Sequence, residues 1–177
     1  MIQRIQSVFL ALAMLLTSLL FSFVLCDFHL PENHLAVIPG DNIAIMKMNG
    51  FIAPYEHFNQ IVAPSRFPLL VVLTSLLFIL LAITLFSYKN RPRQIKLCTI
   101  TFFVNIILLG YLFLSPDMIS SRLSSVLDLG LDKQAARKMV HYQWASFFPL
   151  VSLIFVRLAS RNIKKDEALV RSAERLR

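Results

Sequence analysis

The chain has 177 residues, of which 56% are hydrophobic and 16% are charged, and its formal net charge is +8. A soluble chain of this composition would have too little polar surface, and the apolar runs leave no stretch long enough for a separate catalytic domain. The composition excludes an ordinary soluble enzyme and predicts one membrane domain.

Four apolar runs follow one another along the chain. Each is about as long as a helix that crosses a ~30 Å hydrocarbon core, and only a helix satisfies its own backbone hydrogen bonds there. We therefore expect an all-α membrane protein, a bundle of four transmembrane helices. The expected spans are about 7–26, 67–88, 97–114 and 142–159, joined by outer loops 27–66 and 115–141 and an inner loop 89–96, and followed by an inner helical tail 160–177.

Lys and Arg residues gather on alternate sides of these runs. With the N-terminus in the cytoplasm, twelve of the 18 cations lie on the inner side, whereas seven of the ten acidic residues lie on the outer side. This asymmetry predicts a multi-pass inner-membrane protein with both termini in the cytoplasm. The excess positive charge is explained by the orientation of the chain in the membrane. Because no nucleic-acid-binding module accompanies it, no nucleic-acid partner is expected.

The two outer loops carry their own structural signals. In the first, Leu35–Ile38 and Ile43–Met48 resemble strands around a Pro39–Asn42 turn, which predicts a small β-hairpin. In the second, Ser115–Asp117 is a helix-start pattern and predicts a short interfacial helix. A further helix is expected from Lys133 through His141 into the fourth span.

Polar residues inside the expected spans bear on transport. No ionisable residue lies near the middle of a span, where a proton or ion pathway usually needs one. We interpret Asn105 as a residue that forms an interhelical hydrogen bond, worth about 1 kcal/mol or less. Pro149 is expected to free the carbonyl of Ala145 and to kink the fourth span. A small-solute transporter stays an alternative, and it predicts a polar cavity around Asn105 and Pro149.

The four histidines all fall on the expected outer side: His29, His34, His57 and His141. With Glu32 and Glu56 they offer enough ligands for a metal, but neither a His-x3-His pair nor a Cys/His pattern is present. We assign no metal site, no cofactor and no catalytic residue. A membrane enzyme with an outer metal site stays a second alternative, and it predicts that these histidines and acids converge.

The expected inner face carries the most specific sequence pattern, in Met1–Gln6, in Tyr88–Arg91 with Gln94–Leu97, and in Ile163–Arg177. Over the whole chain this pattern resembles a bacterial family of small four-span membrane proteins known as domain of unknown function 4293. The ending is its sharpest part, Lys-Asp-Glu followed by Leu-Val-x-Ser-x-acidic-Arg-Leu-Arg, with Glu174 where the family pattern has Asp. The resemblance implies fold and membrane placement. It implies no activity, catalytic residue or cofactor.

The tail is expected to continue the fourth span as one ordered helix, because nothing from Val151 onward breaks it. Opposite charges lie three and four residues apart, each pair worth a few tenths of a kcal/mol, and Leu169, Ala173 and Leu176 form an apolar stripe. We expect a non-enzymatic interaction protein whose basic inner face contacts anionic headgroups of the bilayer and a membrane or cytoplasmic protein. The candidate interaction surface is Lys164, Lys165, Asp166, Glu167, Leu169, Arg171, Glu174, Arg175, Leu176 and Arg177.

The partition of cations predicts the outcome of cysteine labelling. In intact cells, Asn90→Cys and Ser172→Cys should resist a membrane-impermeant thiol reagent, whereas Asn42→Cys should react. All three variants should react after the membrane is permeabilised, as read from the mass shift of the labelled chain. Labelling of Ser172→Cys in unbroken cells would contradict the orientation.

Overall fold

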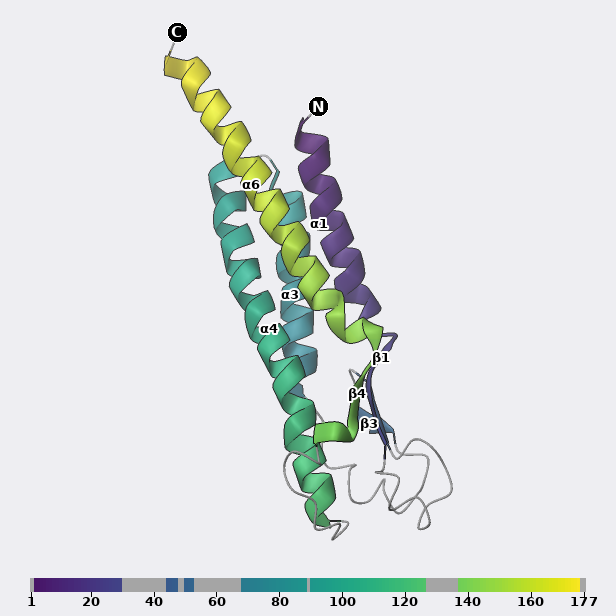
Figure 1. The fold of residues 1–177 in the computed structure, drawn as a ribbon. Helices are drawn as coiled ribbons and strands as arrows, with labels where there is room; N and C mark the ends of the chain where they lie inside the picture. Colours follow the sequence, from purple (N-terminus) through teal and green to yellow (C-terminus); the bar gives the residue numbers. More distant parts are fainter. Residues whose placement is uncertain are drawn as a thin grey trace. The chain divides into compact units, whose positions relative to one another are not determined.

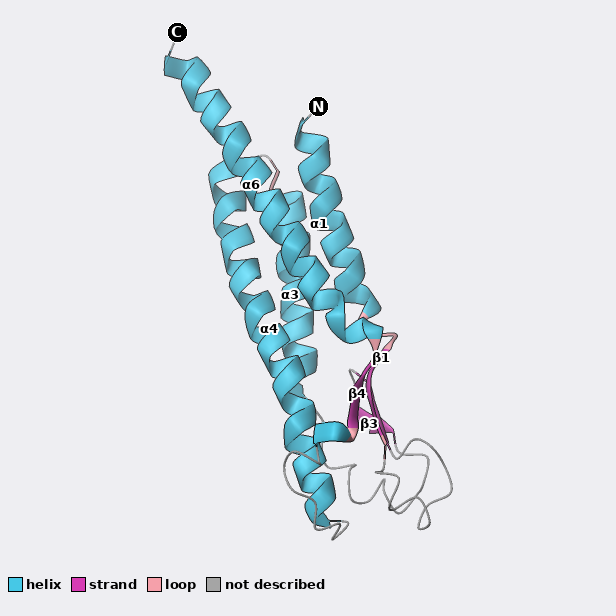
Figure 2. Ribbon diagram, in the orientation of Figure 1, coloured by secondary structure: helices cyan, strands magenta, loops and turns pink. Residues whose placement is uncertain are grey.

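The computed structural model describes residues 2–29, 44–47, 50–52, 68–88, 90–126 and 137–175. The chain divides into two compact units, of which one is helical and the other contains a sheet. Figures 1 and 2 show the elements, which are α1 (Ile2–Leu19), β1 (Val24–Phe28), β2 (Ala44–Lys47), β3 (Gly50–Ile52), α3 (Pro68–Phe86), α4 (Arg91–Val126), β4 (Val140–Tyr142), the 3-10 helix η2 (Trp144–Phe147) and α6 (Phe148–Arg175).

The first unit is helical and comprises Met1–Ser18, Val72–Leu109 and Phe148–Arg177. Within it α6 packs on α1, where the rings of Phe9 and Phe155 stack with their centroids 6.0 Å apart. On its other side α6 packs on α4, where the Arg157 guanidinium lies 5.8 Å from the centre of the Phe102 ring. The helix α6 therefore holds α1 and α4 together.

The interior of this helical unit contains polar as well as apolar side chains, and apolar side chains cover its outside. The hydroxyls of Thr17, Thr84 and Thr101 are buried, and each donates to the carbonyl four residues earlier in its own helix. Large apolar side chains are exposed on α1 and α3: Ile5, Val8, Leu12, Leu15, Val72, Leu76, Ile79, Ile83 and Phe86. So continuous an apolar exterior would be unstable in water and indicates a membrane protein.

Among the residues that the structure describes, three helical stretches are long and apolar enough to cross a membrane by length and composition: Leu69–Phe86, Arg91–Met118 and Trp144–Val170. They correspond to the second, third and fourth predicted spans. The apolar part of α1, Ile5–Leu19, is shorter. The helix α6 runs unbroken to Arg175, in agreement with the predicted continuous tail.

Asn105 on α4 is fully buried and binds the backbone of α6. With its amide oriented to satisfy both contacts, its nitrogen donates to the carbonyl of Pro149 at 3.3 Å and its oxygen accepts from the backbone N–H of Leu153 at 3.2 Å. The predicted interhelical hydrogen bond is therefore present, and it uses both ends of the amide.

The prediction of a kink at Pro149 was wrong, because Pro149 is the second residue of α6. The N–H groups of the first helical turn have no intrahelical partner, so a proline costs nothing there. The residues before it form η2 rather than a continuous helix, and His141 lies in β4 instead of the predicted helix.

The second unit, Leu19–Val71 with Gly110–Phe147, contains an antiparallel sheet with the strand order β3-β2-β1-β4. The strand β1 is central: Asp27 pairs with Ile45 of β2 on one edge and with His141 of β4 on the other. Its side chains Leu25, Cys26 and Phe28 are buried. Ser146 of η2 donates its hydroxyl to the carbonyl of Leu25, which fixes η2 to the strand.

This sheet corrects one sequence prediction, the end of the first span. The first span was expected to reach Cys26, but α1 ends at Leu19, whose carbonyl accepts from the N–H groups of Ser22 and Phe23 at 3.0 and 3.2 Å. The residues after Leu19 are aromatic and β-branched, and such residues are as favourable in a strand as in an apolar helix. Whether they form a strand or a helix depends on the distant segments with which they pair.

The structure contains a hairpin of β2 and β3. The strand β2 falls within the predicted Ile43–Met48 and pairs with β1 on one edge and with β3 on the other. The other predicted strand of the hairpin is Leu35–Ile38. Residues 30–43, which include that strand and the predicted turn, lie outside the described residues. Asn49-Gly50 at the junction of β2 and β3 is itself a hairpin signal.

The predicted interfacial helix is not separate, since α4 continues through Pro116 to Val126. Pro116 has no N–H to donate to the carbonyl of Leu112, four residues earlier. The hydroxyl of Ser115 donates to that same carbonyl at 3.4 Å and replaces the missing bond. The pair Ser115-Pro116 therefore continues the helix here instead of starting a new one.

The contact of Asn105 with α6 predicts a measurable contribution to stability. Asn105→Leu should lower the free energy of unfolding in bicelles by about 0.5–1.5 kcal/mol, because it removes the hydrogen bonds between α4 and α6. Thr101→Val is the matched control, because the Thr101 hydroxyl donates to the carbonyl of Leu97 within α4, so its loss should cost much less. Equal effects of the two substitutions would contradict the role assigned to Asn105.

Candidate functional site

The three segments of the most specific sequence pattern meet at one end of the helical unit. Gln6 of α1 donates its side-chain N–H to the carboxylate of Asp166 on α6. Arg91, the first residue of α4, donates from Nη1 to the backbone carbonyl of Asp166 at 3.4 Å. Gln94 donates from Nε2 to the carbonyl of Thr84 in α3 at 3.2 Å. We refer to Gln6, Arg91, Gln94 and Asp166 as the polar cluster.

The polar cluster is buried to a degree unusual for such groups. Gln6, Gln94 and Asp166 are only 5%, 4% and 8% exposed. Burying a carboxylate is costly unless hydrogen bonds replace its water, and the Gln6 amide supplies one. The cluster therefore joins all four helices of this unit: α1 to α6, α6 to α4, and α4 to α3.

One face of α6 leads into the polar cluster. Its buried residues recur at helical spacing and end at the carboxylate: Val156, Ala159, Ser160, Ile163 and Asp166. Lys164 and Lys165 are exposed on the other side of the helix. One turn beyond Asp166 the same helix exposes apolar side chains, since Leu169 is 61% exposed and Val170 is 42% exposed.

This exposure has a geometric cause. Nine residues of α6 follow Asp166, whereas only four residues of α1 precede its partner Gln6. At 1.5 Å per residue α6 extends about 7 Å past the start of α1. Figure 1 shows the last turns of α6 beyond the ends of its neighbours in this unit.

The predicted interaction surface is thus divided. Lys164, Lys165 and Leu169 are exposed, whereas Asp166 lies in the interior and serves the polar cluster. Glu167 is half-buried and has an interaction of its own. Arg171, Glu174 and Arg175 belong to the last turns of α6, where the backbone alone is described, and Leu176 and Arg177 lie outside the described residues.

Sequence reasoning did not identify Gln6 and Arg91 as partners of Asp166, nor Gln94 as a donor to α3. Each lies in a segment of the most specific pattern, and that coincidence was the available signal. Without a structure, three separate segments of a membrane protein can share a pattern for reasons of topology alone.

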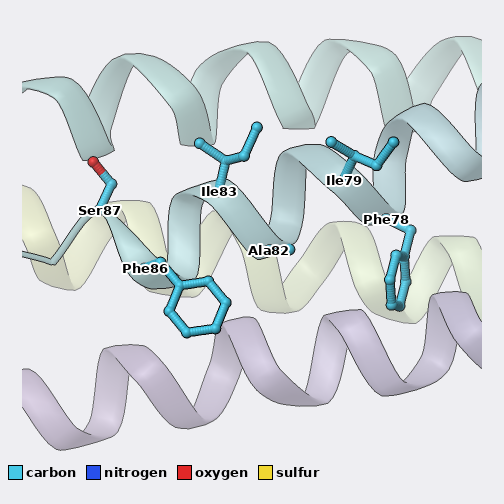
Figure 3. Close-up of a pocket in the computed structure, with 6 residues that line it drawn as sticks. All are labelled: Phe78, Ile79, Ala82, Ile83, Phe86 and Ser87. Carbon is cyan, nitrogen blue, oxygen red and sulfur yellow. The ribbon is translucent and has the colours of Figure 1, made fainter.

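A shallow groove lies along the outside of α3. It is lined by residues of one helical face: Phe78, Ile79, Ala82, Ile83, Phe86 and Ser87. In Figure 3 the rings of Phe78 and Phe86 lie on one side of the helix and Ile79 and Ile83 on the other, with small Ala82 between them. The lining is apolar apart from Ser87, which suits an acyl chain and offers no group for catalysis.

The second unit contains the described part of the histidine set. The rings of His29 and His141 lie edge to face with their centroids 4.6 Å apart. Glu32, His34, Glu56 and His57 lie outside the described residues. Among the residues that the structure does describe, no group of three or more His, Cys, Asp or Glu side chains is arranged to hold a metal ion.

Tyr142 ties β4 to α4 in the second unit. Its hydroxyl donates to the carbonyl of Phe113 at 3.1 Å. Burial raises the pKa of the Tyr142 hydroxyl, and the negative charge of Asp117 raises it further. Asp117 in turn pairs with Arg137 at 3.2 Å. The hydroxyl is therefore a structural donor that connects the two elements.

Comparison with known proteins gives one result. A family model described as Domain of unknown function (DUF4293) matches residues 2–176, nearly the whole chain. No curated protein and no solved structure matches the chain. The match confirms the resemblance inferred from the three segments that form the polar cluster.

The hydrogen bond between Gln6 and Asp166 predicts strong coupling in a double-mutant cycle. Gln6→Ala and Asp166→Ala should each destabilise the chain, and the double variant should cost less than their sum by about 1.5–3 kcal/mol, as expected for a hydrogen bond to a carboxylate. The measurement is the free energy of unfolding in bicelles. Lys165→Ala, at the exposed neighbour of Asp166, is the control and should change little. A coupling near zero would show that the contact contributes nothing.

Proposed function

Because the chain belongs to the family named domain of unknown function 4293 (DUF4293), which carries no activity to transfer, we propose that it is a non-enzymatic membrane protein acting by interaction. In this proposal the last turns of α6 dock on a protein partner at the cytoplasmic face of a bacterial inner membrane. The cations near the polar cluster hold the same face against anionic headgroups.

One observation carries the proposal, the exposed apolar side chains at the end of α6. Leu169 and Val170 lie just beyond the last buried residue of a helix whose base is fixed by Gln6 and Arg91. A helix that only marked orientation would need cations and no apolar residues there. Helices that dock into a groove of another protein usually present exposed apolar residues of this kind.

Charge supports the lipid part of the proposal. Arg161, Lys164 and Lys165 are exposed on α6, and Arg93 and Lys96 are exposed on the first turns of α4. Each cation close to an anionic leaflet contributes about 1 kcal/mol. The groups are spread over two helices, which fits contact with a surface better than capture of a single ligand.

The proposed topology has four spans with both termini in the cytoplasm, and α1 is the span that needs argument. Its 18 residues measure about 27 Å, close to the ~30 Å hydrocarbon core. Large apolar side chains are exposed along its length, and Phe9 packs against α6. These features support a short fourth span.

The transporter alternative receives less support. It would place a polar cavity at Asn105 and Pro149, where the amide of Asn105 instead binds the backbone of α6 at both of its ends. The buried hydroxyls of Thr17, Thr84 and Thr101 are likewise directed to their own helices. The polar groups at these positions have structural partners, so no second function is proposed.

Complementation of a null strain tests the docking face. Leu169→Asp should abolish rescue of the null phenotype, because a charge on the exposed apolar face prevents docking. Ala168→Asp is the matched control: it places the same charge on the neighbouring exposed residue, on a different side of the helix, and should still rescue.

Both variants must be compared at equal membrane abundance. A truncation that removes residues 168–177 keeps Asp166 and hence the polar cluster, so it should insert normally and fail to rescue. Full rescue by the truncated chain would exclude the tail as the working surface.

A further inference from the structure

His29 and His141 lie on the same face of the sheet in the second unit. Side chains alternate along a strand, so Asp27 and His29 share a face, and His141 is the direct partner of Asp27 on the adjacent strand β4. The backbone N–H of His29 donates to the carbonyl of Met139 at 2.9 Å, which extends the pairing by one residue. The two histidines are therefore diagonal neighbours across two strands, close enough for their rings to meet.

The spacing of the two rings suits a shared metal ion. Two imidazoles bound to one metal at about 2.0–2.1 Å, with an angle of roughly 90–110° between them, have ring centres about 4.5–5.3 Å apart. The centroids of His29 and His141 are 4.6 Å apart, with an angle of 83° between the ring planes.

The surroundings favour a cation. The carboxylate of Asp27 lies on the same face and accepts a hydrogen bond from the side-chain N–H of Gln143, which holds it in place. His141 is exposed and His29 half-buried, so a hydrated ion can reach both. Imidazole nitrogen selects zinc, copper or nickel over magnesium and calcium, which prefer oxygen ligands.

We propose that His29 and His141 form a two-histidine site for a divalent transition metal, with Asp27 supplying negative charge beside it and water completing the coordination. Such an ion would cross-link β1 to β4. The proposal does not depend on the function proposed for the tail.

The test uses the full-length chain in lipid nanodiscs, purified with a tag that contains no histidine. Titration with Zn²⁺ measures affinity, and electron paramagnetic resonance with one equivalent of Cu²⁺ reports the number of bound imidazole nitrogens. The wild type should bind one ion with two such nitrogens. His29→Ala and His141→Ala should each weaken Zn²⁺ binding by at least about tenfold, the least that loss of even an outer-shell group usually costs.

Two controls distinguish this site from other histidines and from misfolding. His57→Ala should leave the Zn²⁺ affinity and the Cu²⁺ spectrum unchanged. If the His57→Ala variant lost Zn²⁺ binding, the two-histidine assignment would be overturned. Zn²⁺ should raise the melting temperature of the wild type, because it binds only the folded sheet, and should not raise that of a folded His29→Gln variant. Absence of stoichiometric binding, or binding that survives His29→Gln and His141→Ala, would also overturn the proposal.

Discussion

The need to pair every backbone polar group inside the chain governs this structure, because lipid offers no replacement for water. Long helices meet that need along most of their length, and side chains meet it where a helix is interrupted. The hydroxyl of Ser115 takes the place of the N–H that Pro116 lacks. Pro149 sits in the first turn of α6, where no N–H is required. These local solutions allow α4 and α6 to be long and continuous.

The same need explains how far the fold could be predicted. The apolar runs that form α3, α4 and α6 can be recognised from the sequence alone, because an apolar run of that length is stable in lipid only as a helix. The helix boundary predicted at Ser115 is absent. Ser-Pro is typical of a helix start, but the same pair can continue a helix when the serine hydroxyl replaces the hydrogen bond that the proline cannot donate. The strand β1 could not be distinguished from the end of an apolar helix, because its partner His141 lies more than 100 residues away.

The candidate site was predicted in part, for a similar reason. The exposure of Lys164, Lys165 and Leu169 could be predicted from charge and helical spacing alone. Asp166 is adjacent to them in sequence, and spacing gives no reason to place it inside. Its burial depends on Gln6, whose distance along the chain is 160 residues. The burial of a polar residue can be predicted from the sequence only when its hydrogen-bond partner is known.

The first and last helices are joined in the helical unit, and the strands that flank them in the sequence pair with each other in the second unit. In the helical unit Gln6 binds Asp166, and Phe9 stacks on Phe155. In the second unit the strand that follows α1 pairs with the strand that precedes α6. In the helical unit α6 therefore cannot shift along α1 without breaking the contact between Gln6 and Asp166. The register of these two helices is thus set by one buried polar contact and one aromatic contact, and the exposed side chains of Leu169 and Val170 lie one turn beyond the polar one.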